Sequence, residues 1–451
     1  MLHRLAIQLR ESGISSGIVS AGFWGLVVRA AGVASTFVVG VILARLLGPA
    51  QFGVYGLVVA LSLILSVVAQ AGLPTLATRE IAVALAQSNW SHLEGTVRSF
   101  SLFVLGASVC FASGLIIVVL AEPILFGSAP TAYLLGSLLV PIFAMTVLAG
   151  AALRPLGVLI FGQSLETLIR PSILIVLCSA FFLTGNKLDA RIGVGLNAGA
   201  GAITLCIAAI VLFKTVQRRT GETSPSYTPR IWTRAAIPLA LVDWLRQADA
   251  TYGILLVGML CSDADAGYFR LAFSICVCIA APLGVFHQVL APTIAQVTAA
   301  GDIKGLQRLL SRAALMMTAI MVVEFAAIAL AGTKIITWIF GLAYSSAAVP
   351  LTLLATAQVI NGSFGMTWVV LAMGGGEREL TKSLLPSVAI SVAVAVPLGI
   401  NWGVTGVAAA AIVGALIQNM IAWGYVRRKF GVDGSFVAAL GAVRSNLGGR
   451  S

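Results

Sequence analysis

The 451 residues of this chain are 59% hydrophobic and only 10% charged, with a mean hydropathy of +1.02. Ordinary globular domains carry about 25% charged residues, so this composition excludes a water-soluble domain. Lys and Arg outnumber Asp and Glu by 28 to 16, a formal charge of +12. The basic residues lie between the apolar stretches, which indicates orientation in a membrane rather than nucleic-acid binding.

Apolar runs separated by charged residues, proline or glycine predict about twelve transmembrane helices, each of about 20 residues. In chain order they lie near residues 18–44, 51–73, 99–121, 131–153, 165–184, 193–213, 235–260, 267–291, 313–331, 348–373, 383–400 and 404–426. The polar segment 214–234 contains two prolines and is typical of a linker. We therefore expect six-helix bundles at 1–213 and 235–426, and a basic tail at 427–451.

Loop charges predict the orientation of these helices. If the loops alternate between the two sides, about twenty basic residues fall on the side of the N-terminus. Only Arg45, Lys187, Arg191 and Lys334 fall on the other side. Because positively charged loops stay in the cytoplasm, both termini are predicted to be cytoplasmic. The residues before the first span are expected to form a short cytoplasmic helix.

A weak internal repeat supports two bundles of the same orientation. Residues 46–57 (LLGPAQFGVYGL) align with 260–271 (LCSDADAGYFRL) at an offset of 214, which matches Gly53 with Gly267 and Tyr55 with Phe269. Repeats related by an axis along the membrane normal are a known transporter architecture. The repeat and the central linker together predict an all-α protein of two six-helix bundles.

Ionisable side chains within the predicted spans are the strongest functional signal, because each costs about 2.5–3.5 kcal/mol at the centre of a membrane helix. They are Arg29, Glu166, Arg170, Asp243, Arg246, Asp249, Arg270 and Glu324. Asp243, Arg246 and Asp249 recur at every third residue and therefore share one helix face. This face is either an ion-pair ladder shielded by neighbouring helices or the wall of a water-filled cavity; we favour the cavity.

The arginines suit an anionic ligand, since the planar guanidinium binds two phosphate oxygens at once. We predict that Arg29, Arg246 and Arg270 bind such a ligand, and that Asp243 and Asp249 balance their charge. Arg270 lies near the outer end of its span, where reaching out to the lipid headgroups is an equal alternative.

Two acids are also candidates for ion coupling. Glu324 is the lone acid of its span, and Asp249 lies on the polar face described above. For Glu324 the alternative is an ion pair with an arginine on a neighbouring helix. The sequence has no Walker A motif, and its histidines and cysteines lack the spacing of a metal site. We expect no cofactor, no metal and no catalytic activity.

Residues 38–82 resemble the start of Wzx-type polysaccharide transporters, the oligosaccharide-lipid flippases of the MOP superfamily. The residues that carry this resemblance are Arg45, Leu47, Gly48, Pro49, Phe52, Gly53, Tyr55, Gly72, Leu73, Pro74, Arg79 and Glu80. In the second half, Asp249 followed by GYFRLAF from Gly267 to Phe273 is similar to a further segment of that family.

The resemblance implies a MATE-like fold with alternating access in the inner (plasma) membrane of a bacterium. The implied activity is movement of polyprenyl-diphosphate-linked sugar repeat units to the outer leaflet, for lipopolysaccharide or exopolysaccharide. It also implies a basic central cavity, for which Arg29 is the candidate on the first span; Asp243 and Arg246 depart from the family pattern.

The expected partners are the lipid-linked glycan, membrane lipids and other polysaccharide assembly proteins, but not nucleic acid. Three alternatives remain. A MATE-like exporter of small cations would need a net acidic cavity, against which the excess of arginine argues. The others are an intramembrane glycan polymerase or ligase, and a scaffold of an assembly complex.

Overall fold

The computed structural model describes residues 16–127, 129–221, 226 and 229–441. Within these ranges the chain is almost entirely helical and contains no β-strand. Nine of the described helical segments are long and apolar enough to cross a membrane. The predicted all-α, multi-pass class is thus confirmed. The helix expected before the first span and the end of the basic tail lie outside the described residues.

The chain forms two compact units. Unit 1 comprises Met1–Ile42 and Ser62–Asp243, and unit 2 comprises Leu43–Leu61 and Trp244–Ser451. The boundaries fall inside α2 (Ser16–Gln70) and α10 (Pro229–Leu260), so both helices contribute to both units. The division into bundles at the polar segment 214–234 stays a prediction.

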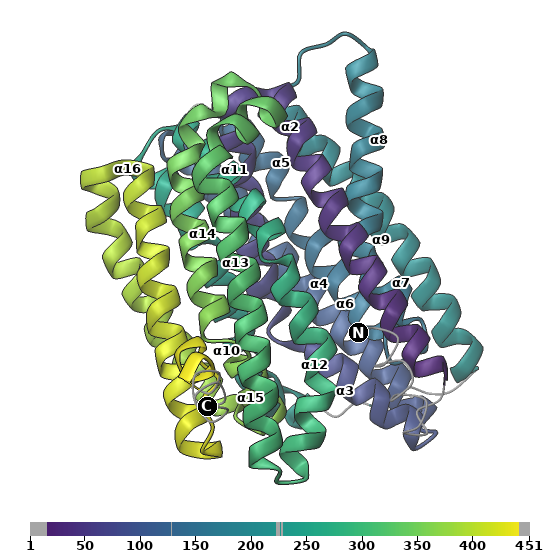
Figure 1. Cartoon of the computed structure of the whole chain (residues 1–451). Helices are drawn as coiled ribbons and strands as arrows, with labels where there is room; N and C mark the ends of the chain where they lie inside the picture. The colour runs from purple at the N-terminus through teal and green to yellow at the C-terminus, as the bar shows by residue number, and fades with distance from the viewer. Residues whose placement is uncertain (1–15, 128, 222–225, 227–228, 442–451) are drawn as a thin grey trace. The chain divides into compact units, whose positions relative to one another are not determined.

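Unit 1 is built around α4 (Trp90–Ala121), α6 (Leu139–Leu153) and α9 (Ala190–Thr220), of which α6 packs against both others (Figure 1). Its further helices are α3 (Leu73–Ala86), α5 (Pro130–Gly136), α7 (Leu159–Ser164) and α8 (Arg170–Leu183). A π-helical turn, Leu165–Ile169, joins α7 to α8. The core of the unit lies where α3, α4 and α6 meet, around Leu76, Leu93 and Leu148.

The end of the predicted linker is bound to α4 of unit 1. The Ser226 amide donates a hydrogen bond to the Ser91 carbonyl oxygen at 3.0 Å. The Ser226 carbonyl lies so close to Gly95 that no side chain fits there. Six residues later, Trp232 is only 4% exposed, and its ring meets the edge of Phe100 at 5.1 Å between centroids. The first turns of α10 are therefore fixed to unit 1.

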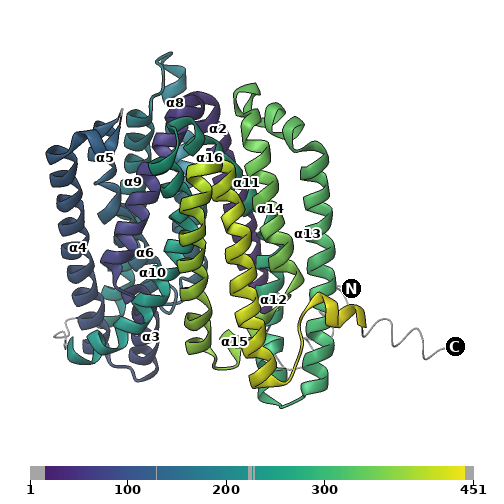
Figure 2. The same cartoon turned by 90° about the vertical axis from the view of Figure 1, so that its left-hand side faces the viewer.

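Two long helices, α16 (Glu377–Phe430) of unit 2 and α2 of both units, break where the hydropathy pattern predicts a gap between spans. The further helices of unit 2 are α11 (Asp263–Ile279), α12 (Ala281–Ala299), α13 (Ile303–Phe340), α14 (Ala348–Ser363) and α15 (Thr367–Met373). At Gly403 (φ 57, ψ −139), α16 reverses and forms two antiparallel legs (Figure 2). Similarly, α2 breaks at Gly48 (φ 72, ψ 171). Both backbone conformations favour glycine. Dividing α2 and α16 there, and adding α10, brings the number of spans near the predicted twelve.

The segment that follows α16 folds back onto the start of α13. The Gln307 side chain accepts a hydrogen bond from the Asp433 amide and donates one to the Asp433 carbonyl, both at 2.7 Å. The Asp433 carboxylate in turn accepts hydrogen bonds from Trp423 at 2.8 Å and from the Ser435 hydroxyl at 2.7 Å. Part of the predicted tail is thus an ordered portion of unit 2.

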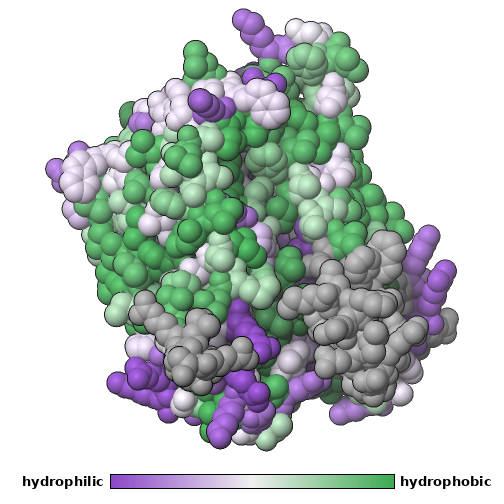
Figure 3. Space-filling view, viewed as in Figure 1, coloured by the Kyte–Doolittle hydropathy of each residue, from purple (hydrophilic) through white to green (hydrophobic). Residues whose placement is uncertain are grey.

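The surface of the helices is that of a membrane protein. Hydrophobic residues cover the sides of the helices, and hydrophilic residues gather toward their ends (Figure 3). Large apolar side chains such as Ile117, Val323 and Leu330 are 65%, 68% and 87% exposed. Apolar patches of this extent are rare on soluble monomers but match a hydrocarbon environment.

Candidate functional site

The two segments matched by the internal repeat pack against each other in unit 2. A Cβ atom on Gly53 would overlap the Asp263 carbonyl and the Gly267 amide, and one on Gly267 would overlap the Pro49 carbonyl. At the offset of 214, Pro49 matches Asp263 and Gly53 matches Gly267. Each repeat therefore makes the same contact with the other, as across a two-fold axis. The close approach of α2 and α11 requires glycine on both.

This approach places Arg270 on α11. Its aliphatic stem lies against Gly56, where a Cβ atom would come within 2.5 Å of the Arg270 Cδ. The Arg270 guanidinium is 5.8 Å from the centroid of the Tyr55 ring. A guanidinium within about 6 Å of an aromatic ring is attracted to its electron-rich face. Tyr55 and Gly56, both from the repeat segment, thus hold this charge within the membrane-spanning part.

Arg246 on α10 has an aromatic partner that the sequence does not reveal. Its guanidinium is 4.4 Å from the ring centroid of Trp368 on α15. The Arg246 side chain remains exposed. No spacing or motif connects Trp368 with Arg246, whereas Tyr55 lies in a segment that the repeat marks. An exposed guanidinium on an aromatic surface can offer its N–H donors to an anion.

The acids of unit 2 are partly shielded from solvent. Asp249 is half-buried on α10, and it interacts electrostatically with Tyr252 on the next turn. Glu324 is half-buried on α13, and its Oε2 atom is buried without a hydrogen-bond partner among the described residues. A buried polar atom without a partner needs an explanation, such as a bound ion, water or proton.

The predicted site residues are divided between the two units. Unit 2 contains Arg246, Asp249, Arg270 and Glu324. Unit 1 contains Arg29, which is exposed on α2, and Asp243, which is half-buried on α10. Within unit 2, α10 and α11 both meet the part of α2 that follows Gly48, because Ile254 and the Arg270 stem both lie against Gly56.

Unit 1 has a further charged cluster around the π-helical turn. Arg170 lies 4.4 Å from the centroid of the Phe143 ring, and its Nη1 atom is buried without a hydrogen-bond partner among the described residues. Glu166 lies four residues earlier in the turn, where it interacts electrostatically with Arg170. The same contact, a guanidinium over an aromatic ring, thus occurs at Arg170, Arg246 and Arg270.

The helix that bears Arg29 packs against this turn. A Cβ atom on Gly32, one turn beyond Arg29, would lie 2.8 Å from the Thr167 Cβ. A π-helical turn inside an α-helix is frequent at functional sites. No sequence pattern predicted this turn.

These groups can bind ions but offer no catalytic constellation. Guanidinium groups in an apolar setting attract phosphate, and carboxylates attract cations or protons. Among the described residues, no group of three His, Cys, Asp or Glu side chains is placed to hold a metal ion.

Solved structures show which fold this is. A MATE-family multidrug resistance transporter of the MOP superfamily, in its inward-facing conformation, matches with a TM-score of 0.73 at 15% identity, over 91% of this chain and 98% of that chain. The lipid II flippase MurJ matches with a TM-score of 0.66 at 13% identity, over 91% and 88%. A MOP superfamily transporter from Pyrococcus furiosus, described as having a binding pocket of reverse polarity, matches with a TM-score of 0.59 at 13% identity, over 91% and 95%.

These matches confirm the predicted MATE-like fold, and the matched proteins are transporters and a flippase rather than enzymes. None of the curated proteins matches this chain significantly. The family model described as polysaccharide biosynthesis protein matches residues 21–298. This match covers more than half of the chain and confirms the resemblance to Wzx-type transporters. The chain therefore belongs to the polysaccharide biosynthesis protein family of membrane transporters.

Proposed function

We propose that this protein flips a polyprenyl-diphosphate-linked oligosaccharide from the cytoplasmic to the outer leaflet of a bacterial inner membrane, for a surface polysaccharide. The observation that carries this proposal is the set of arginines within the membrane helices. Arg246 and Arg270 are each supported by an aromatic ring in unit 2. A guanidinium held in this way keeps donors for phosphate oxygens at a fixed position, at low cost in side-chain entropy.

The substrate class follows from the family and from charge. The family description places the chain in polysaccharide biosynthesis, and one structural neighbour is described as a lipid II flippase. In the proposed mechanism the lipid tail stays in the bilayer while Arg29, Arg246 and Arg270 bind the diphosphate, and Asp243 and Asp249 balance their charge. The two predicted bundles rock about the linker between Lys214 and Arg234, with both termini in the cytoplasm.

Ion coupling is proposed for Glu324 and Asp249. Support comes from the Glu324 Oε2 atom, which is buried without a hydrogen-bond partner among the described residues. A carboxylate in this position can take up a proton or a cation during the transport cycle. We expect a pH jump outside proteoliposomes to change the flipping rate, and Glu324→Gln and Asp249→Asn to reduce that response. Insensitivity of the wild type to the jump would remove the coupling proposal.

The central test is flipping of a fluorescent polyprenyl-diphosphate oligosaccharide by the full chain in proteoliposomes. Arg29→Ala and Arg246→Ala should each slow flipping at least tenfold, the equivalent of about 1.4 kcal/mol of lost phosphate binding. Arg191→Ala is the matched control, because Arg191 lies in the first turn of α9, before the predicted span 193–213, where it is 56% exposed and pairs with Asp189 at 3.6 Å. If Arg29→Ala and Arg246→Ala flip at the wild-type rate, the proposed site is wrong.

The same vesicles separate the flippase from the alternatives. A MATE-like exporter would move a cationic dye along an imposed ion gradient and leave the lipid-linked glycan in place. A polymerase or ligase would lengthen or transfer the glycan, which mass spectrometry of the recovered lipid detects. A scaffold would do neither and would bind assembly proteins instead. Flipping of an unaltered glycan is the result that the proposal requires.

A further inference from the structure

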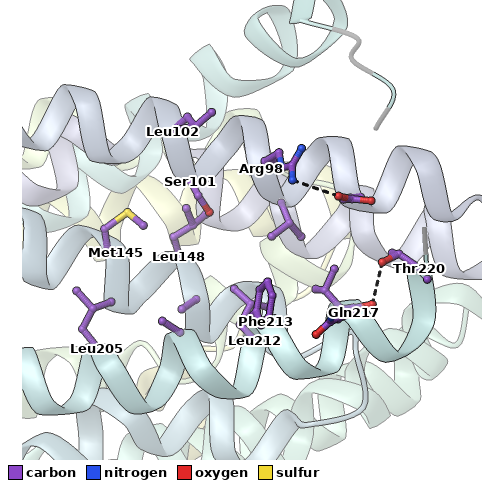
Figure 4. Close-up of a pocket in the computed structure, with 16 residues that line it drawn as sticks. Arg98, Ser101, Leu102, Met145, Leu148, Leu205, Leu212, Phe213, Gln217 and Thr220 are labelled. Atoms are coloured by element: carbon purple, nitrogen blue, oxygen red, sulfur yellow. Dashed lines mark hydrogen bonds and ion pairs between the residues drawn. The ribbon is translucent and has the colours of Figure 1, made fainter. Parts of the chain in front are cut away.

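A cavity of about 450 Å³ lies in unit 1, between α4, α6 and α9 (Figure 4). The proposed transport site uses none of the residues that line it. Small side chains create the space, since Ala149 of α6 and Ala209 of α9 both border it. Behind it, Ala149 packs in a core cluster with Leu153, Leu165 and Ala208.

Polarity changes along the cavity. Glu94, Arg98, Gln217 and Thr220 gather at one end, where α9 finishes and α4 is in its first turns. The other end is lined mainly by apolar side chains, among them Leu102, Met145 and Leu205. Figure 4 shows Arg98 on one helix and Gln217 and Thr220 on the opposite helix toward one end of the cavity, with Met145 and Leu205 toward the other end. This arrangement matches a molecule with a polar head and a hydrocarbon chain.

The cavity opens sideways, toward the hydrocarbon of the membrane. Leu102 is 67% exposed and Phe213 is 66% exposed, and both line the cavity, so it is open at these two residues. Exposed apolar residues on a membrane helix face lipid. An occupant would therefore enter from the bilayer, and the polar end lies on the side that the loop charges predict to be cytoplasmic.

The polar end holds one charge of each sign. Arg98 Nη2 is 3.6 Å from Glu94 Oε1, and the Arg98 and Glu94 side chains are 60% and 20% exposed. An exposed pair four residues apart on a helix contributes only about 0.3–0.5 kcal/mol, so a ligand can separate it easily. A zwitterionic headgroup complements such a pair, because its phosphate suits the guanidinium and its ammonium suits the carboxylate.

We propose that this cavity binds a zwitterionic phospholipid of the cytoplasmic leaflet. One acyl chain lies between α4, α6 and α9. The headgroup phosphate contacts Arg98, and the headgroup ammonium contacts Glu94. The lipid is a resident of unit 1, distinct from the transported substrate.

Photocrosslinking of the full chain tests the acyl-chain part of the proposal. Vesicles contain phosphatidylethanolamine and phosphatidylglycerol in equal amounts, with a trace of either lipid bearing a diazirine on one acyl chain. The phosphatidylethanolamine probe should label peptides that contain Met145 and Leu205, several-fold more than the phosphatidylglycerol probe. Ala209→Trp, which fills the cavity, should remove most of this labelling. Ile207→Trp, on a part of α9 outside the cavity, should not.

Two measurements keep the test decisive if Ala209→Trp does not fold. In the wild type, excess unlabelled phosphatidylethanolamine should compete with the probe at these peptides, and phosphatidylglycerol should compete less. Glu94→Gln leaves Arg98 as the only charged side chain among the described residues that line the cavity, and should reverse the preference toward phosphatidylglycerol. Arg98→Gln should weaken labelling by both probes. A wild-type preference for phosphatidylglycerol, or a folded Ala209→Trp variant with undiminished labelling, would overturn the proposal.

Discussion

The backbones of α2 and α11 touch in unit 2, whereas in unit 1 a cavity remains between α4, α6 and α9. In unit 2, Gly53 and Gly267 bring α2 and α11 into direct contact. In unit 1, Ala149 and Ala209 border the space between α4, α6 and α9. Lipid gives no hydrophobic drive for helix association, so close approach at small residues is a main source of stability. Small residues therefore have different consequences in the two places: paired glycines allow two helix backbones to touch, and the alanines leave a cavity between three helices.

The largest expected effect comes from breaking the glycine contact. Gly53→Leu would force a side chain into the Asp263 and Gly267 backbone, which cannot move aside as a flexible side chain could. Overpacking usually costs about 1–3 kcal/mol, and a backbone clash costs at least the upper value. We expect almost no monodisperse protein on gel filtration in detergent. Gly106→Leu is the control, because nothing lies within 4 Å of a Cβ at Gly106 of α4. If Gly53→Leu and Gly106→Leu lost equal amounts of monodisperse protein, the glycine contact of unit 2 would have no special role.

A smaller effect is expected where the start of α10 is held to unit 1. Trp232→Ala removes a side chain that is 4% exposed and packs against Phe100. A large-to-small change of this kind costs about 3 kcal/mol. We expect a lower midpoint of thermal unfolding and faster proteolysis between α9 and α10. Trp338→Ala, at a residue that is 81% exposed, serves as the control and should leave both quantities nearly unchanged.

Next in size is the effect of moving Arg270 without unfolding unit 2. A methyl group at position 56 would come within 2.5 Å of the Arg270 Cδ, and the flexible stem can give way. Gly56→Ala should therefore unfold near the wild-type temperature but flip lipid-linked glycan several-fold more slowly. Gly40→Ala is matched, since nothing lies within 4 Å of a Cβ at Gly40. Unchanged flipping by a folded Gly56→Ala variant would show that the position of Arg270 does not matter for transport.

The smallest effect is expected at Asp433, whose hydrogen bonds hold the segment after α16 against unit 2. Burial disfavours the charged form of Asp433, but hydrogen bonds from Ser435 and Trp423 and the charge of Arg427 outweigh it and hold the pKa of this carboxyl below its ordinary value. The carboxylate therefore stabilises the folded state above its ordinary pKa, and this stabilisation is lost as the pH falls through the lowered pKa. Asp433→Asn should cost less than about 1 kcal/mol at neutral pH, after allowance for solvent screening.

Thermal unfolding at several pH values checks this prediction. The difference in unfolding temperature between wild type and Asp433→Asn should be largest at neutral pH and should shrink as the pH falls below about 3.9, the ordinary pKa of aspartate, toward the lowered pKa of Asp433. A difference that stays constant across this range would mean that the charge of Asp433 contributes nothing.

Local features of the sequence predict much of the fold, because membrane helices are defined by local hydropathy. The breaks at Gly48 and Gly403 fall in the gaps between predicted spans. The repeat already paired Gly53 with Gly267, although not as a contact.

Contacts between segments that are far apart in the sequence could not be predicted from local hydropathy. Trp368 lies beneath Arg246 only because α15 packs near α10, and Ser226 meets Gly95 only after the linker folds back. The cavity arises from three helices at once. Whether Arg29 and Asp243 of unit 1 act together with the arginines of unit 2 stays a prediction.

The reciprocal contact of Gly53 and Gly267 also bears on how such a chain can evolve. After a gene duplication, two halves are normally free to diverge. Here Gly53 meets the backbone of Asp263 and Gly267, Gly267 meets the backbone of Pro49, and no substitution can remove backbone atoms to make room for a larger residue. A change on one side therefore has no compensating change on the other. Comparison of family members should find these two positions among the slowest to vary, while the helices around them drift apart.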